Sequence, residues 1–292
     1  MSLYLGCPIW SFKGWVGNFY PTGTKPADFL REYARRLTTI EGNTTFYAIP
    51  APKTIKAWIE HTPETFRFCP KIPKAISHNG KLLDYVDRTL YFMDVMRPLA
   101  ARLGPMFLQL PPRYSPSLLA DLEAFLTRMP RDLRLAVEVR HLDWFEDGYR
   151  NKLNELLADH NMARVVIDTR PIRTLAGDES IRGGAYESLL EARERKPNVP
   201  VFEEITADFT FLRFIGHPNM EQNLPFIREW AARAVDQLVA GKDAYIFCHS
   251  PDNLLAPFIA REFHRQISSR VEVVPLPWDH IQDDTPRQAT LF

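Results

Sequence analysis

A carboxylate and an amide occur in a segment of the chain whose other residues favour a β-strand. Residues 40–50 contain Glu41, Asn43 and Thr45 among β-branched and aromatic side chains, and two prolines, Pro50 and Pro52, close the segment. Side chains of a strand alternate between its two faces, so we expect these three side chains on one face. Buried polar groups need partners or water, which makes Glu41 and Asn43 candidate site residues. A polar layer that only determines packing is the alternative interpretation.

Eight segments with strand character alternate with helical patterns along the chain. The strand segments are residues 3–7, 39–47, 66–73, 106–110, 133–139, 163–168, 209–215 and 244–248. Near-continuous apolar segments such as 163–168 are typical of parallel strands that are covered on both faces. We therefore predict an α/β fold, a single parallel eight-stranded (β/α)8 TIM-like barrel over residues 1–278, with a polar tail at 279–292. Between the last strands, residues 169–204 read as a long irregular loop with at most a short helix.

In such a barrel the carboxyl ends of all strands open on one face, which carries the active site. We expect the candidate residues to gather there. The candidate catalytic acids or bases are Glu41, Glu138 and Asp168. The candidate substrate-binding residues are Asn43, Lys71, Gln109, Arg140, His141, Arg213, His217 and His249. Both signs of charge together suit an anionic or phosphate-bearing substrate in a hydrolase, lyase or isomerase, with the basic residues holding the anion. Structural ion pairing is the alternative for some of them.

Two other kinds of site are compatible with these residue types. A divalent metal could be bound by carboxylate and imidazole ligands, but neutral structural histidines are the commoner outcome, so we predict no metal ligand. The candidate metal ligands would be Glu138, His141, Asp168, His217 and His249. Aromatic residues near the loops could stack on a base or a sugar, or could simply pack the rim of the barrel. A nucleic acid is therefore the alternative partner to a small anionic molecule.

The composition of the chain argues against some of the possible partners. The 36 basic residues balance the 36 acidic residues, so no overall field favours nucleic acid or an anionic membrane. No stretch of 18 apolar residues occurs and the N-terminus does not resemble a signal peptide, so we expect a soluble, cytoplasmic protein without a membrane partner. The three cysteines are widely spaced and are interpreted as buried thiols.

Several motifs in this order resemble the YecE-like family, which is domain of unknown function number seventy-two. They are Glu41-x-Asn43-x-Thr45-Phe46-Tyr47-x-x-Pro50, Leu103-Gly104-Pro105-x-x-x-Gln109-Leu110-Pro111-Pro112 and Ala136-Val137-Glu138-x-Arg140-His141-x-x-Trp144. Together with further matches they span most of the chain. The resemblance implies a TIM-like barrel, and it implies no established reaction.

The final residues carry a separate short motif. Gln288, Leu291 and Phe292 follow a polar segment that contains Pro286. The pattern Gln-x-x-Leu-Phe resembles the peptide by which bacterial replication and repair proteins bind the DNA sliding clamp. A frayed end that folds back on the barrel is the alternative. Clamp binding would favour a role in DNA maintenance over small-molecule metabolism.

The tail hypothesis predicts that truncation after Arg287 abolishes clamp binding. A short peptide must be ordered when it binds, so we expect a dissociation constant in the micromolar range for the full-length chain. Titration of purified sliding clamp with both proteins measures this. Equal binding by the two proteins, or binding by neither, would remove the hypothesis.

Overall fold

The computed structural model describes residues 1–281, in which eight parallel strands form a nearly closed barrel. The strands are β1 (Leu3–Cys7), β2 (Thr39–Gly42), β3 (Arg67–Pro70), β4 (Met106–Gln109), β5 (Leu135–Glu138), β6 (Ala163–Asp168), β7 (Phe209–Ile215) and β8 (Asp243–His249). Their order in the sheet is β3-β2-β1-β8-β7-β6-β5-β4, so the first and last strands are neighbours. Strands β3 and β4 meet through single residue pairs, Lys71 with Phe107 and Phe68 with Leu103. The predicted TIM-like barrel is confirmed.

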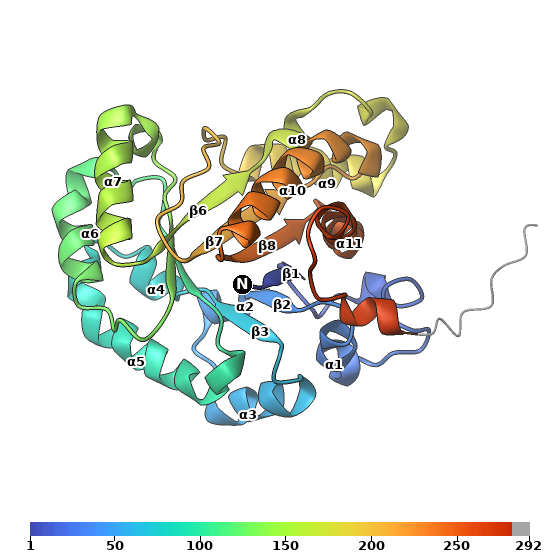
Figure 1. The fold of residues 1–292 in the computed structure, drawn as a ribbon, viewed down its shortest axis with the longest axis horizontal. Helices are drawn as coiled ribbons and strands as arrows, with labels where there is room; N and C mark the ends of the chain where they lie inside the picture. Colours follow the sequence, from blue (N-terminus) through green and yellow to red (C-terminus); the bar gives the residue numbers. More distant parts are fainter. Residues whose placement is uncertain (282–292) are drawn as a thin grey trace, which may run out of the picture.

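Helices connect successive strands and surround the sheet, as Figure 1 shows for α3, α5, α6, α7, α10 and α11. The helices are α1 (Phe29–Ala34), α2 (Thr44–Tyr47), α3 (Pro52–His61), α4 (Lys74–Ser77), α5 (Val86–Met96), α6 (Leu119–Leu126), α7 (Asp147–Asp159), α8 (Arg170–Arg173), α9 (Gly184–Arg195), α10 (Leu224–Val239) and α11 (Ala256–Ser268). Short 3-10 turns are η1 (Lys13–Trp15), η2 (Pro26–Asp28), η3 (Leu82–Tyr85), η4 (Arg97–Arg102), η5 (Pro116–Leu118), η6 (Leu142–Phe145), η7 (Asp178–Ser180), η8 (Met220–Gln222) and η9 (Pro277–His280). None of the helices within residues 1–281 is both long and apolar enough to cross a bilayer.

Aromatic side chains fill the inside of the barrel up to the level where the strands end. Phe107, Phe211 and Phe247 lie in one buried cluster, with ring centroids 5.3 Å apart for the first pair and 4.7 Å for the second. Because side chains alternate along a strand, Arg213 on β7 points to the same interior as Phe211. Beyond this apolar layer, Arg213 and the other candidate site residues lie towards the carboxyl ends of the strands.

Two elements differ from the sequence-based expectation. Strand β2 ends at Gly42, and Thr44–Tyr47 forms the helical turn α2 instead of continuing the strand. The Thr45 hydroxyl stabilises this turn by donating to the backbone oxygens of Gly42 and Lys71, at 2.8 and 2.7 Å. The segment read as irregular contains the twelve-residue helix α9, whose Leu189 and Ala192 are buried against the barrel rim. Tertiary packing therefore overrides the weak local pattern there.

Near its end the described chain packs against the barrel. Trp278 in η9 contacts the rings of Phe19 and Phe258, with centroids 5.0 and 5.7 Å away. The predicted clamp-binding residues Gln288, Leu291 and Phe292 lie outside the described residues, so that hypothesis and the domain boundary at residue 278 stay predictions.

Candidate functional site

A buried guanidinium joins two carboxylates at the carboxyl end of the barrel. Arg213 on β7 donates from Nε and Nη2 to the two oxygens of Glu41 on β2, at 2.9 and 2.8 Å. Its Nη1 donates to Glu138 on β5 at 2.6 Å. Both glutamates are fully buried, and Arg213 is 4% exposed. The planar, forked guanidinium group can serve two acceptors in this way, which an ammonium group could not do with the same geometry.

The network continues from Glu138 towards β3 and β4. Arg140 donates from Nε to the second oxygen of Glu138 at 2.7 Å and from Nη2 to Gln109 Oε1 at 2.8 Å. Lys71, directly after β3, donates to the same Gln109 oxygen at 2.9 Å. Gln109 therefore holds two cationic side chains in fixed positions.

On its other side the network reaches β8 and the loop after β2. His249 Nε2 lies 3.0 Å from Glu41 Oε2, and Asn43 donates to Glu41 Oε1 at 2.7 Å. Asn43 also donates to the backbone oxygen of Pro8 at 3.2 Å, which anchors it to the end of β1. Eight of the predicted site residues thus form one hydrogen-bonded cluster, which we call the polar cluster: Glu41, Asn43, Lys71, Gln109, Glu138, Arg140, Arg213 and His249.

The carboxylates of the polar cluster are held ionised. Burial alone would raise the pKa of Glu41, but the Arg213 guanidinium and His249 lower it well below its usual range. Burial would likewise raise the pKa of Glu138, but Arg213 and Arg140 lower it to about 2. Burial lowers the pKa of His249 to about 4 despite the nearby Glu41, so its imidazole is neutral at pH 7 and donates to Glu41 through Nε2. At neutral pH the two glutamates act as counter-ions.

The pKa values of two lysines are also lowered, which for a lysine favours the neutral form. Burial, with the positive charge of Arg213, lowers the pKa of Lys71 to about 7. Burial and Arg213 also lower the pKa of Lys196 to about 8. No carboxylate of residues 1–281 lies within ion-pair distance of either ammonium group. Both lysines can therefore change protonation state near neutral pH, which the glutamates do not.

Lys196 and Phe46 lie near the polar cluster, although the sequence reasoning did not assign them to the site. Burial and the charges of Arg213 and Glu41 shift the pKa of Lys196, and Phe46 contacts Lys71. Lys196 follows α9 in a charged run, a pattern that reads as a solvated surface, so no sequence signal distinguishes it. Phe46 in α2 lies under Lys71, whose Nζ is 4.0 Å from the centre of the ring. The motif that contains Glu41 and Asn43 also contains Phe46, which was the available signal.

Three predicted site residues are placed elsewhere. Asp168 is buried at the end of β6, but its carboxylate accepts from the indole of Trp230 on α10 at 2.7 Å and pairs with Arg170. It therefore faces the helices outside the barrel. His217 pairs with Asp178, 3.2 Å away. His141 caps η6 by accepting from the backbone N–H of Asp143. A shared role with the polar cluster is not supported by these positions.

The separate positions of these residues also bear on whether they could coordinate a metal ion. The metal ligands considered from sequence are Glu138, His141, Asp168, His217 and His249, and each of the last three has a different partner. Over residues 1–281, no three His, Cys, Asp or Glu side chains converge in a way that could hold a metal ion. The residues present do not fit a divalent metal site.

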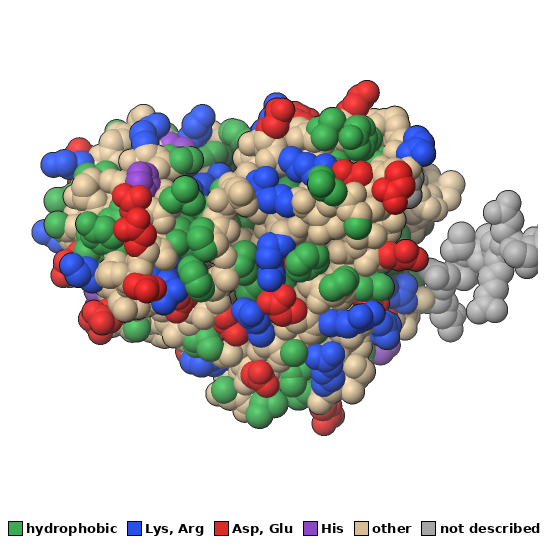
Figure 2. Space-filling model, turned by 90° about the horizontal axis from the view of Figure 1, so that it is seen from above, with side chains coloured by type: hydrophobic (Ala, Val, Ile, Leu, Met, Phe, Trp, Pro, Cys, Tyr) green, Lys and Arg blue, Asp and Glu red, His purple; other side chains and the backbone are tan. Residues whose placement is uncertain are grey.

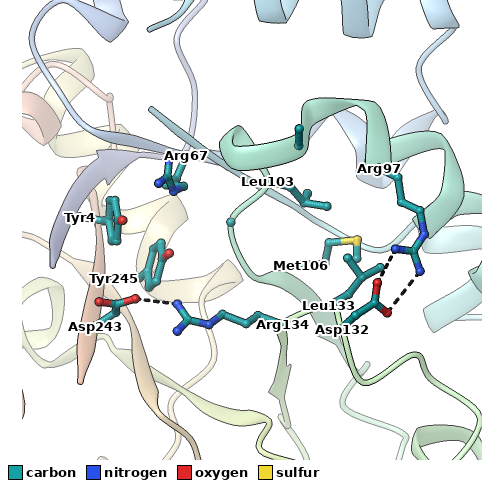
Figure 3. Close-up of a pocket in the computed structure, with 12 residues that line it drawn as sticks. Tyr4, Arg67, Arg97, Leu103, Met106, Asp132, Leu133, Arg134, Asp243 and Tyr245 are labelled. Carbon is teal, nitrogen blue, oxygen red and sulfur yellow. Dashed lines mark hydrogen bonds and ion pairs between the residues drawn. The ribbon is translucent and has the colours of Figure 1, made fainter. Parts of the chain in front are cut away.

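A cavity of about 460 Å³ lies at the opposite end of the barrel, around the amino ends of the strands (Figure 3). Tyr4 and Tyr245 stack in its wall, with ring centroids 4.5 Å apart. Its charged side chains are largely paired with one another, as Arg134 and Asp243 are at 2.6 Å. Residues at this end of a TIM-like barrel serve stability, so we do not place the chemistry there.

The fold and the polar cluster can now be compared with known proteins. The family described as "Protein of unknown function DUF72" matches residues 4–284. The UPF0759 protein YecE of Escherichia coli (strain K12) is 34% identical over 294 residues, which cover 99% of this chain and 100% of that protein. This chain belongs to the DUF72 family. The resemblance seen in the sequence motifs is confirmed.

Solved structures of DUF72 proteins have the same fold. A DUF72 protein from Thermotoga maritima superposes with a TM-score of 0.65 and is 21% identical, covering 92% of this chain and all of that one. A second, from Enterococcus faecalis, also has a TM-score of 0.65 with 16% identity, covering 96% of this chain and 97% of that one. At these identities the similarity establishes the barrel and nothing finer.

We expect Arg213→Met to destabilise the protein by roughly 3–5 kcal/mol, because it leaves two buried carboxylates without their shared partner. Urea denaturation measures the free energy of unfolding. The matched control is Arg35→Met, whose partner Glu32 is 3.2 Å away but whose side chain is 60% exposed, so its change should be much smaller. Equal losses in the two variants would contradict the central role of Arg213.

Lys71→Met should stabilise the protein below pH 7, with a benefit that declines as the pH rises towards 10. The folded pKa of Lys71, about 7, lies below its unfolded value, so the charged lysine costs stability at low pH and the neutral lysine does not at high pH. Even half of this pKa shift corresponds to roughly 2 kcal/mol. Thermal melts at pH 6 and pH 9.5 test it. If Lys71→Met stabilised the protein equally at both pH values, the Lys71 amine would not be neutral in the folded protein.

Proposed function

We propose that the polar cluster binds a small anion and that this chain is an enzyme acting on an anionic or phosphate-bearing substrate. The proposal rests on which charged side chains already have a partner of opposite charge. Glu41 and Glu138 are already paired with Arg213 and Arg140, whereas Lys71 and Lys196 have no carboxylate partner within residues 1–281. An anion at these lysines would supply the missing negative charge and raise their lowered pKa values.

The contacts also favour particular roles. Arg213 is occupied by both glutamates, so Lys71, Lys196 and Arg140 are better placed to hold an anion than Arg213 is. The low pKa values of Glu41 and Glu138 favour a counter-ion role over the predicted acid–base role. Lys71, with a pKa near 7, has the value that suits proton transfer at neutral pH.

Inorganic phosphate is the simplest probe of the anion site. We expect Lys71→Met and Lys196→Met each to weaken phosphate binding by about tenfold or more, because each removes one positive charge from a buried site. Isothermal titration calorimetry at pH 8 measures affinity. The heat should also depend on the ionisation enthalpy of the buffer, because the bound anion raises the lysine pKa values and the complex takes up protons.

The matched control is Lys53→Met, which changes an exposed lysine on α3 away from the polar cluster and the hollow beside Phe46. Its phosphate affinity should equal that of the wild type. Phosphate affinity that is unchanged in all three variants would contradict the anion site. Catalysis is tested by incubating wild type and Lys71→Met with a mixture of phosphorylated and carboxylated metabolites; equal consumption by both would contradict the assigned role of Lys71.

The nucleic-acid alternative stays a prediction. On the face drawn in Figure 2, Lys and Arg side chains are interspersed with Asp and Glu side chains. That arrangement is unlike the basic stripe of most proteins that bind DNA backbones. Salt-dependent binding of single-stranded or nicked DNA, measured by fluorescence anisotropy, would favour the alternative.

A further inference from the structure

The amine of Lys71 lies in surroundings unlike those of the other cations of the polar cluster. Its Nζ donates to an amide oxygen, that of Gln109, and otherwise lies 4.0 Å from the centre of the Phe46 ring and 5.6 Å from that of Phe107. The side chain is 6% exposed. Arg213, by contrast, is saturated by two carboxylates. Burial and the nearby guanidinium groups favour the neutral form of this amine, and neutral amines are nucleophiles.

A substrate would also have room beside this amine. Phe46 separates Lys71 from a hollow of about 380 Å³ that is lined by Phe46, Tyr47, His78 and Arg88, among others. Phe46 and His78 are half-buried, and their rings meet edge to face at 5.2 Å. Lys71 does not line the hollow, and Phe46 lies between the two, so rotation of the half-buried Phe46 ring would let a molecule in the hollow direct one end towards Lys71.

We propose that Lys71 is a nucleophile that forms an imine with the aldehyde or ketone carbon of an anionic substrate. This inference rests on the proposed function, because Lys196 and Arg140 of the same anion site would hold the charged group of that substrate and leave the Lys71 amine neutral. The Nζ lone pair attacks the carbonyl carbon, the C–O π electrons move to oxygen, and a proton passes from nitrogen to oxygen to give a carbinolamine. Loss of water then leaves a C=N bond, so one amine and one carbonyl give one imine and one water, with no oxidant or reductant.

The surrounding charges suit such an intermediate. A protonated imine keeps the positive charge at Nζ, and the ionised Glu138 nearby attracts that charge. Gln109 Oε1 accepts from both Lys71 and Arg140, which keeps the amine beside a group that can hold the anionic end of the substrate. Gln109 is therefore a positioning residue in this reaction.

Pyridoxal 5′-phosphate is a suitable probe because it is an anionic aldehyde whose imine absorbs visible light. Reduction by sodium borohydride converts the imine into a stable secondary amine that peptide mass spectrometry locates. At pH 7.5 we expect one pyridoxyl phosphate group per chain, on Lys71. Neutral pyridoxal should react there at least tenfold more slowly, because it lacks the anion. The trapping rate should rise with an inflection near pH 7, whereas ordinary lysines, with pKa values of about 10.4, react at higher pH.

The controls separate Lys71 from the surface lysines. Lys71→Met should lose the adduct, and Lys53→Met, which removes an exposed amine on α3 outside the hollow, should keep it. Circular dichroism verifies that both variants are folded. Labelling spread over surface lysines, and equal in wild type and Lys71→Met, would overturn the imine proposal. If phosphate binds as proposed but Lys71 forms no adduct, the imine proposal alone fails; if neither phosphate nor pyridoxal phosphate binds, both proposals fail.

Discussion

The shared ion pair between Arg213 and two glutamates is the interaction on which the carboxyl end of this barrel depends. Glu41 and Glu138 come from β2 and β5, and Arg213 comes from β7, so the guanidinium ties together strands that are not neighbours in the sheet. Desolvating two carboxylates costs several kcal/mol each unless a well-placed cation compensates. Arg213 is that cation. The other polar side chains of the cluster are hydrogen-bonded to the two glutamates or to one another.

The charged side chains at this end of the barrel form two sets, the glutamates that pair with arginine and the two lysines. The glutamates are committed to arginine, which makes them poor proton donors or acceptors at neutral pH and good counter-ions. Within residues 1–281, Lys71 and Lys196 have no such carboxylate partner, and their pKa values are close to neutrality. Clusters of buried groups with strongly shifted pKa values are typical of functional sites. The amino end of the barrel differs, since Arg134 and Arg97 there pair with nearby aspartates on or near the surface.

Sequence reasoning succeeded for residues on interior positions of the strands and failed where the alternation or a local turn placed a residue differently. Gln109, Glu138 and Arg213 lie on interior positions of regular strands, so their convergence followed from the barrel prediction. Asp168 also ends a strand, but its position in the alternation directs it outwards to Trp230. The helical turn at Thr44–Tyr47 was read as strand because β-branched and aromatic residues favour strands, and the turn exists because Thr45 bonds to backbone oxygens of two segments.

The sequence by itself determined the α/β barrel, the membership in the DUF72 family and the eight members of the polar cluster. These follow from local patterns, from the order of motifs along the chain, and from the rule that parallel strands end on one face. Only the tertiary structure decided which charges pair. Ion pairing depends on distances of a few ångströms between residues such as Glu41 and Arg213, which are 172 positions apart in the chain. The inclusion of Lys196 and the lowered pKa of Lys71 likewise arise from burial and neighbouring charge, and these exist only once the barrel has closed.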